Sequence, residues 1–271
     1  MKKNNIISIL SLFLIFVSCA KYEKRGDKMY YLYWPKENGK IEVIGADLPS
    51  FKALRGRVYA KDKNRVYYRG LVIRGADVNT FKPLSDLYSV DHSRIYFEEH
   101  LLSTTNPKTF KSLKDKYALD EERVYYNGDT LKEADPATFG TIGHYFAKDA
   151  YRVYNQGYLQ KQVSDASSFE IISSDGCGTE WTRDKDFYYH GRYRIEADYP
   201  SFVLIDKGKD GYAKDRFHVY FCDCLSEPII VKGADPKTFK MTGKYKNVGK
   251  DKNGYYWNGE LTSKGKLGKL L

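Results

Sequence analysis

The sequence predicts an all-β fold made of tandem repeats of about 29 residues, each a β-meander or hairpin with a short capped helical turn. The first observation is composition, since 25 tyrosines and 14 phenylalanines occur among 271 residues and aromatic side chains favour half-buried pleated sheets. The second is self-similarity, because three successive copies of one string begin at Tyr59, Tyr88 and Tyr117, 29 residues apart. Such a fixed period indicates a repeat architecture.

The repeated string is centred on an aspartate. Its first three copies read YAKDKNRVYYRG, YSVDHSRIYFEE and YALDEERVYYNG. Four further copies begin at Phe146, Trp181, Tyr212 and Gly249. The aspartates of the seven copies are Asp62, Asp91, Asp120, Asp149, Asp184, Asp215 and Asp251. We expect each of them to start a turn, because an aspartate carboxylate can accept backbone N–H groups two residues further on.

A second pattern, Asp/Asn-x-x-Ser/Thr-Phe, also occurs seven times. Its copies end at Phe51, Phe81, Phe110, Phe139, Phe169, Phe202 and Phe239. In the copy DPATF we expect Asp135 to cap a short helical turn, Pro136 to fit its first position and Thr138 to bond back locally. The phenylalanine then closes the turn as an apolar plug. The first copy lies in a degenerate leading half-repeat, so the array has about seven and a half repeats.

These strings resemble the DKNYY family, a group of bacterial envelope proteins named for the aspartate-lysine-asparagine-tyrosine-tyrosine string. The resemblance extends from about Met29 to Gly259. It implies membership of a family that is known by its repeat and has no established activity. No catalytic residue is therefore carried over from it.

The repeat at residues 117–139 shows the expected strands. Two short apolar-rich strands flank the corner at Asp120, and a third strand follows a tight turn at Asn127 and Gly128. That turn is of type I′, in which both central residues have positive φ. The sequence thus predicts about three short strands and one capped turn in each repeat.

A repeat of this length cannot bury enough apolar surface to fold alone. Stacking of successive repeats supplies the missing contacts. We expect an extended or curved array, with a closed propeller-like ring as the alternative. Propeller blades of four strands need roughly 40 to 45 residues, which favours the array.

The N-terminus predicts a lipid anchor. A positively charged start and the apolar run at residues 6–17 are typical of a secretory signal. Ser18 and Cys19 then resemble the lipobox of bacterial lipoproteins, which implies acyl chains such as palmitate on Cys19. We therefore expect a cell-envelope protein outside the cytoplasm, at the outer membrane if the cell has two membranes. The predicted parts are a signal peptide (1–18), a lipid-anchored tether (19–28), the repeat array (29–260) and a basic C-terminal tail (261–271).

The charge pattern argues against a nucleic-acid partner. The formal net charge is +10 and becomes +8 when the signal peptide, with Lys2 and Lys3, is removed. Positive and negative residues are interleaved along the chain, whereas nucleic-acid-binding proteins concentrate lysine and arginine on one face or segment. The membrane, an envelope protein or a glycan remain as expected partners.

Turn formation, rather than metal binding, explains the repeated aspartates. Calcium loops need further oxygen ligands at alternating positions. Tyr151 and Phe217 occupy the second position after the aspartate in two copies, which breaks such a series. We predict no cofactor and no metal.

Function is expected where the period fails. Two lengthened repeats contain Cys177 and the pair Cys222 and Cys224. In an oxidising compartment we expect a disulfide between Cys177 and one of the pair; free thiols are one alternative, and a zinc site completed by His218 is another. Together, these four residues form the predicted partner surface.

The sequence predicts a non-enzymatic binding or structural module with no catalytic residues. It lacks Gly-x-Ser-x-Gly, His-Glu-x-x-His and glycine-rich phosphate loops. One alternative is a glycan-binding protein whose exposed tyrosines in successive repeats form a stacking ladder. A second alternative is a hydrolase with its site in the irregular region 170–232, which requires a cleft with convergent polar groups.

Overall fold

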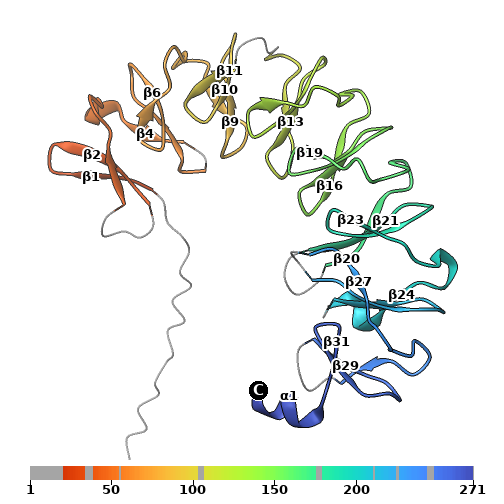
Figure 1. Ribbon diagram of the computed structural model, residues 1–271. Helices are drawn as coiled ribbons and strands as arrows, with labels where there is room; N and C mark the ends of the chain where they lie inside the picture. The colour runs from red at the N-terminus through yellow and green to blue at the C-terminus, as the bar shows by residue number, and fades with distance from the viewer. Residues whose placement is uncertain are drawn as a thin grey trace, which may run out of the picture. The chain divides into compact units, whose positions relative to one another are not determined.

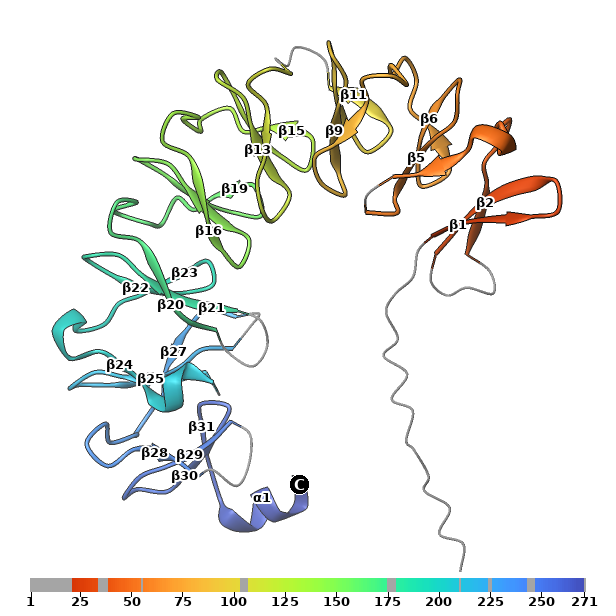
Figure 2. The same ribbon diagram turned by 180° about the vertical axis from the view of Figure 1, so that it is seen from behind.

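The computed structural model describes residues 21–33, 39–54, 56–102, 107–174, 179–209, 211–223, 226–242 and 247–270. In these ranges the strands form eight small antiparallel sheets, one after another along the chain. Figures 1 and 2 show the short strands of each sheet from the two sides. The predicted all-β tandem fold is confirmed, and no sheet in the described ranges closes into a barrel.

The first sheet has three strands and each of the other seven has four. The first eleven strands are β1 (Lys21–Arg25), β2 (Lys28–Leu32), β3 (Lys40–Glu42), β4 (Lys52–Ala53), β5 (Tyr59–Lys61), β6 (Val66–Tyr68), β7 (Leu71–Val72), β8 (Lys82–Pro83), β9 (Tyr88–Val90), β10 (Ile95–Phe97) and β11 (His100–Leu102).

The next twelve strands build three sheets. They are β12 (Lys111–Ser112), β13 (Tyr117–Leu119), β14 (Val124–Tyr126), β15 (Asp129–Thr130), β16 (Gly140–Gly143), β17 (Phe146–Lys148), β18 (Val153–Asn155), β19 (Tyr158–Leu159), β20 (Glu170–Ser174), β21 (Glu180–Arg183), β22 (Tyr188–His190) and β23 (Tyr193–Ile195). The last two sheets are β24 (Val203–Leu204), β25 (Tyr212–Lys214), β26 (Val219–Phe221) and β27 (Ile229–Ile230), then β28 (Lys240–Met241), β29 (Val248–Lys250), β30 (Tyr255–Trp257) and β31 (Glu260–Thr262).

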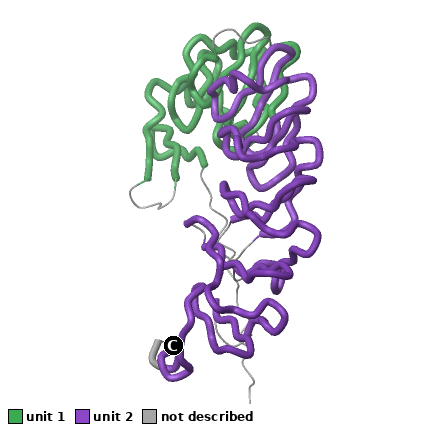
Figure 3. Tube along the Cα trace, turned by 45° about the vertical axis from the view of Figure 1, so that its right-hand side comes forward, with its two compact units in different colours: residues 1–112 green, residues 113–271 purple. Residues whose placement is uncertain are grey.

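Helical structure in the described ranges is short. It comprises the 3₁₀ turns η1 (Leu48–Ser50), η2 (Tyr199–Ser201) and η3 (Ile205–Gly208), and the helix α1 (Lys264–Leu270). The chain divides into two compact units, residues 1–112 and residues 113–271 (Figure 3).

Each four-stranded sheet is a meander in which consecutive strands pair. In one repeat, Tyr117 of β13 lies opposite Tyr126 of β14, and β14 then pairs with β15. Asn127 and Gly128, between β14 and β15, have φ values of 52° and 87°, as the predicted type I′ turn requires. A fourth strand of two residues in most sheets, such as β12, pairs with the first long strand of its sheet. The prediction of about three strands therefore omitted one.

The buried aspartate of each repeat organises its corner. Asp62 accepts the backbone N–H groups of Asn64 at 2.7 Å and Arg65 at 2.8 Å with Oδ1. Its Oδ2 accepts the hydroxyl of Tyr67 at 2.6 Å and the N–H of Asp47 at 2.9 Å. The side chain is buried. The predicted turn role is confirmed, and the second oxygen also joins the hairpin to the preceding capped turn.

The same four contacts recur in other copies. Asp91, Asp184 and Asp215 each accept two N–H groups within the corner, a tyrosine hydroxyl and an N–H from the preceding capped turn. Because one carboxylate satisfies groups from two segments, it fixes the capped turn against the hairpin in each of these repeats.

The capped turn supplies a reciprocal contact. Thr138 donates its hydroxyl to Asp135 at 2.7 Å, which confirms the predicted local bond, and accepts the N–H of Ala150 at 3.1 Å. Phe139 follows, with its ring centroid 5.5 Å from that of Tyr117 and 5.9 Å from that of Tyr154. The phenylalanine plug therefore packs between two successive sheets, as expected for a repeat array.

The ends of the fold differ from the prediction. Residues 19–28 were expected to be a tether, but β1 begins at Lys21 and pairs with β2. The reason is Tyr22, whose ring packs against Phe51 at 5.3 Å and whose hydroxyl donates to the carbonyl of Val58. In the expected basic tail, 261–271, the chain completes β31 and forms α1, where Leu267 is buried.

We predict that acid weakens the fold through these buried aspartates. Burial alone raises the pKa of Asp62, but hydrogen bonds from Tyr67 and three N–H groups outweigh it and hold the pKa below its ordinary value. Asp91 behaves in the same way. A carboxylate with a lowered folded-state pKa stabilises the fold above its unfolded pKa, about 3.9, and loses that stabilisation as pH falls through the folded pKa.

The expected result is a thermal unfolding midpoint that is steady above about pH 5 and falls below about pH 4. The variant Tyr67→Phe removes one hydrogen bond to Asp62, so its midpoint is expected to depend less on pH below 4 than that of the parent. Circular dichroism melts between pH 7 and pH 2.5 measure both effects. Equal pH profiles for parent and variant would contradict the assignment.

Candidate functional site

The residues that recur in every repeat are used by the fold. The tyrosine five residues after the corner aspartate is buried in each repeat, and in five of the seven repeats, including Tyr67, Tyr96 and Tyr125, it donates its hydroxyl to that aspartate. The carboxylates that resembled calcium ligands accept backbone N–H groups instead. Within the described residues, no group of three histidine, cysteine, aspartate or glutamate side chains is arranged to hold a metal ion.

The predicted tyrosine ladder is wrong for the repeated pairs. At the second position of the pair, Tyr68 is 2 % exposed and Tyr126 is half-buried. These rings stack inside the sheets because each lies opposite the tyrosine that starts the preceding strand. Among the described residues, the exposed tyrosines are a different set: Tyr33, Tyr145, Tyr151 and Tyr158.

Successive sheets are sealed at one end by a contact that we call the glycine seam. In the second compact unit, the rings of Tyr117 and Tyr126 stack with centroids 4.8 Å apart. In the next sheet, the N–H of Gly157 donates to the Tyr117 hydroxyl at 3.0 Å. A Cβ at Gly157 would lie only 2.5 Å from the Tyr126 ring. Two rings and one glycine thus close the gap between these sheets.

The same arrangement occurs at both ends of the repeat array. Tyr22, Tyr31 and Gly70 form one glycine seam, with a hydrogen bond of 3.0 Å and ring centroids 5.1 Å apart. Near the C-terminus the corresponding residues are Tyr212, Phe221 and Gly259, with 2.9 Å and 4.9 Å.

The seam between the sheets β16–β19 and β20–β23 departs from this arrangement at three positions. Phe146 replaces the first tyrosine and has no hydroxyl. Asn155, which lies opposite Phe146 in the strand pair, replaces the second ring. In the facing hairpin, Arg192 follows Gly191, so a long cationic side chain stands at the position that glycine occupies in the intact seams. The amide of Asn155 therefore replaces the second aromatic ring, and the guanidinium of Arg192 replaces glycine, which has no side chain.

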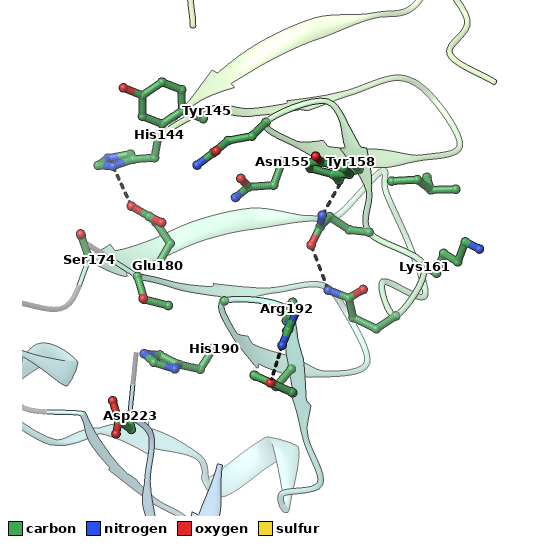
Figure 4. A pocket seen from close by; sticks show the side chains of 17 residues that line it. His144, Tyr145, Asn155, Tyr158, Lys161, Ser174, Glu180, His190, Arg192 and Asp223 are labelled. Atoms are coloured by element: carbon green, nitrogen blue, oxygen red, sulfur yellow. Dashed lines mark hydrogen bonds and ion pairs between the residues drawn. The ribbon is translucent and has the colours of Figure 1, made fainter. Parts of the chain in front are cut away.

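A cavity of about 1140 Å³ lies at this altered seam. All of its lining residues belong to the second compact unit and come from the pairs β16–β17, β18–β19, β20–β21 and β22–β23 and from the end of β26. Figure 4 shows how these side chains lie around the cavity. They are His144, Tyr145, Asn155, Gln156, Tyr158, Leu159, Gln160, Lys161, Gln162, Ser174, Thr179, Glu180, His190, Gly191, Arg192, Tyr193 and Asp223. We call this cavity the seam cleft.

Polar contacts hold several of these side chains in place. His144 Nδ1 lies 3.1 Å from Glu180 Oε1 on one wall of the seam cleft (Figure 4). On another, the Gln160 amide donates to the carbonyl of Tyr158 at 2.9 Å and accepts from Gln162 at 3.1 Å.

The facing hairpin contributes a third fixed group. The guanidinium of Arg192 lies over the ring of Tyr193, 5.1 Å from its centroid, and donates to the Tyr193 hydroxyl at 3.0 Å. The seam cleft therefore offers amides, a guanidinium, a carboxylate and tyrosine rings to one space. These are groups for recognising hydroxyl-rich or amide-rich ligands by hydrogen bonding and stacking.

The sequence-predicted partner surface is only partly described by the structure. Cys222 is buried in a cluster with Trp181 and Phe202. His218 is exposed at the corner before β26, whereas Cys222 follows the other end of that strand. The two residues therefore do not meet on one face, because about 13 Å of extended strand separates them. At this separation His218 and Cys222 cannot bind one zinc ion together, which removes the zinc alternative that used His218, whereas the partner surface stays a prediction.

The remaining cysteines, Cys19, Cys177 and Cys224, lie outside the described residues. The disulfide between Cys177 and one of the pair therefore stays a prediction. Among the described residues, no helix has the length and apolarity needed to cross a membrane.

Sequence reasoning missed the seam cleft. Its nearest signal is the string VYNQG, in which Asn155 stands where each of the six other aligned repeats has a ring, of tyrosine, phenylalanine, histidine or tryptophan. Taken alone, an asparagine at this position indicates only a repeat that departs from the consensus. The significance of the asparagine depends on knowing which hairpin faces it.

We predict that the intact seams are sensitive to a single methyl group. Gly157→Ala places a Cβ at φ +80° and against the Tyr126 ring, so it is expected to lower the free energy of unfolding by about 3 kcal/mol through backbone strain and overpacking. Gly233→Ala is the control, because Gly233 has φ +78° but nothing within 4 Å of its added Cβ. It is expected to cost about 1 kcal/mol. Urea unfolding curves that give the same cost for both variants would disprove the seam contact.

Comparison with known proteins identifies the family alone. No curated protein and no solved structure matches the chain. A protein-family model described as the DKNYY family matches residues 1–100, 22–158 and 59–193 in three overlapping alignments. These alignments span more than half of the sequence and contain five of the seven repeated aspartate strings. The chain belongs to the DKNYY family.

Proposed function

We propose that the protein is a lipid-anchored, non-enzymatic binding or structural module of the cell envelope. The observation that supports it best is that the residues repeated in every copy serve folding. Asp62 and Tyr67, for example, hydrogen-bond to each other, and Asp62 also accepts three backbone N–H groups from its own corner and the preceding capped turn. A scaffold of this kind displays surface features and does not by itself supply chemistry.

The anchor is proposed from the N-terminal sequence. The apolar run at 6–17 ends at Ser18 and Cys19, the position at which lipoprotein signals are cut and lipidated. Each buried methylene contributes about 0.8 kcal/mol, so attachment through more than one acyl chain is stable. The protein would then stand outside the cytoplasm, at the outer membrane if the cell has two membranes.

Such an anchor would hold the fold close to the membrane. The strand β1 starts at Lys21, two residues after Cys19, and an extended chain spans at most about 3.6 Å per residue. The first sheet would therefore lie within about 7 Å of the lipid-bearing residue.

The seam cleft is the surface feature that favours binding as the role. It combines fixed polar side chains with exposed rings, as the environments of Gln160 and Tyr158 show. Part of the cleft lies in the region 170–232, where a hydrolase site was the alternative, through Glu180, His190 and Arg192. A hydrolase would release fragments of its ligand, whereas a binding protein would leave the ligand unchanged. Measuring released fragments therefore distinguishes the two roles.

We expect that Cys19→Ala moves the protein from the membrane fraction to the soluble fraction of lysed cells, because it removes the acyl attachment site. Cys177→Ala is the matched control and is expected to stay in the membrane fraction. Fractionation followed by immunoblotting measures both. Membrane retention of Cys19→Ala after a high-salt wash would overturn the anchor.

We also expect the detergent-solubilised mature protein to bind isolated envelope material without chemical change to it. Co-sedimentation with purified cell-wall and membrane fractions measures the binding. Chromatography of the supernatant measures any released fragment. Failure to sediment with every fraction would overturn the binding role, and catalytic release of fragments would overturn the non-enzymatic assignment.

A further inference from the structure

At the altered seam, residues that pack against the next sheet are replaced by residues that can form hydrogen bonds with a ligand. An intact glycine seam buries two rings against a glycine, as Tyr117, Tyr126 and Gly157 do. At the seam cleft, Asn155 and Arg192 take the positions of the second ring and the glycine. The loss of the ring is the decisive change, because another repeat carries Glu99 at the glycine position but keeps Tyr68 stacked at 5.1 Å on Tyr59.

The lining of the seam cleft is rich in polar side chains and balanced in charge. Leu159 is the one aliphatic side chain among the lining residues, whereas sites for apolar small molecules are lined mainly by hydrophobic groups. The cations Lys161 and Arg192 are balanced by the anions Glu180 and Asp223. The seam cleft therefore lacks the excess of positive charge that phosphate or polyanion recognition requires.

The polar groups are matched to sugar hydroxyls. An amide offers a donor and an acceptor in one plane, a carboxylate offers acceptors, and each sugar hydroxyl is itself a donor and an acceptor. Gln160 is held by Tyr158 and Gln162, so its amide is already oriented before a ligand arrives. Such preorganisation lowers the entropic cost of binding.

The exposed tyrosines supply surfaces for the apolar faces of sugar rings. The Tyr158 side chain is 77 % exposed and that of Tyr145 is 47 % exposed, and both line the seam cleft (Figure 4). A tyrosine presents a large ring face with a polar tip, which suits a ligand that is apolar on one face and hydroxylated at its edge.

We propose that the seam cleft binds a neutral oligosaccharide. Tyr158 stacks on one sugar ring, and Asn155, Gln160 and Arg192 hydrogen-bond its hydroxyl or amide substituents. The volume of about 1140 Å³ is above the usual range of about 300–1000 Å³ for one small ligand, so the cleft accommodates several linked sugars. This inference rests on the proposed binding role and gives that role a site and a ligand class.

The experiment uses the detergent-solubilised mature protein and three neutral tetrasaccharides as probes: chitotetraose, cellotetraose and maltotetraose. Saturation-transfer NMR detects binding, and isothermal titration calorimetry gives the Kd. We expect at least one tetrasaccharide to bind, and Tyr158→Ala to weaken it at least tenfold. Tyr151→Ala is the matched control, because Tyr151 is 76 % exposed but lies outside the seam cleft; its Kd is expected to be unchanged.

A second variant tests the origin of the cleft. Asn155→Tyr restores the ring that intact seams carry, so it is expected to fold, to occupy the part of the seam cleft beside Phe146 and to weaken tetrasaccharide binding at least tenfold. If this variant does not fold, the exposed Tyr158→Ala still decides the question. Equal binding by parent and Tyr158→Ala would overturn the proposal.

The outcomes separate this inference from the broader binding role. Binding to envelope material with no binding of any neutral tetrasaccharide would overturn the oligosaccharide site and leave the binding role standing. Binding confined to a negatively charged oligosaccharide, such as a glucuronate tetramer, would overturn the neutral ligand class. Loss of all envelope binding would overturn the proposed function itself.

Discussion

The buried aspartate of the repeat corner is the contact on which the fold depends. Its strands are only two to five residues long, so the ladder hydrogen bonds within one sheet are few. Asp62 compensates by satisfying its own corner, the tyrosine of the following strand and the preceding capped turn. One side chain thus sets both the local turn and the junction with the previous segment. Removing such a carboxylate would leave several backbone and hydroxyl donors unsatisfied, at about 1–3 kcal/mol for each buried group.

Because the fold depends on the buried aspartates, the sequence of a repeat can vary only at positions outside these contacts. The corner and the phenylalanine plug are fixed by contacts on several sides, whereas the glycine seam closes only one end of each sheet junction. At the altered seam, the plug Phe169 still packs on Phe146 at 5.6 Å and on Tyr189 at 6.4 Å. The junction therefore keeps its core when Asn155 replaces a ring. The stacking of one ring pair contributes about 0.5–1.5 kcal/mol beyond the area that it buries. The stability of a repeat array is summed over many interfaces, so it does not depend on any one ring pair.

The sequence predicted the parts of the fold that depend on local chemistry. The corners, the type I′ turn at Asn127 and the cap at Asp135 follow from residue types at fixed spacing, and the period gave the number of repeats. It missed the fourth strand, because two residues such as those of β12 carry no alternation signal. It also missed β1, since the pairing of Tyr22 with the leading half-repeat depends on tertiary contacts. The seam cleft was hidden for the same reason, because Asn155, Arg192 and Glu180 meet only through the register of three hairpins.

The seam cleft also indicates how a repeat protein can acquire a site without inserting a new loop. An inserted binding loop must be ordered at an entropic cost of about 1–2 kcal/mol per residue. Exchanging a ring for an amide at Asn155 instead exposes side chains whose backbone is already fixed by the neighbouring sheets. Gln160 and Arg192 then gain their orientation from contacts within their own hairpins. The walls of the cleft are the ends of strands whose corners are held by the buried aspartates. Their backbone is therefore fixed before a ligand binds.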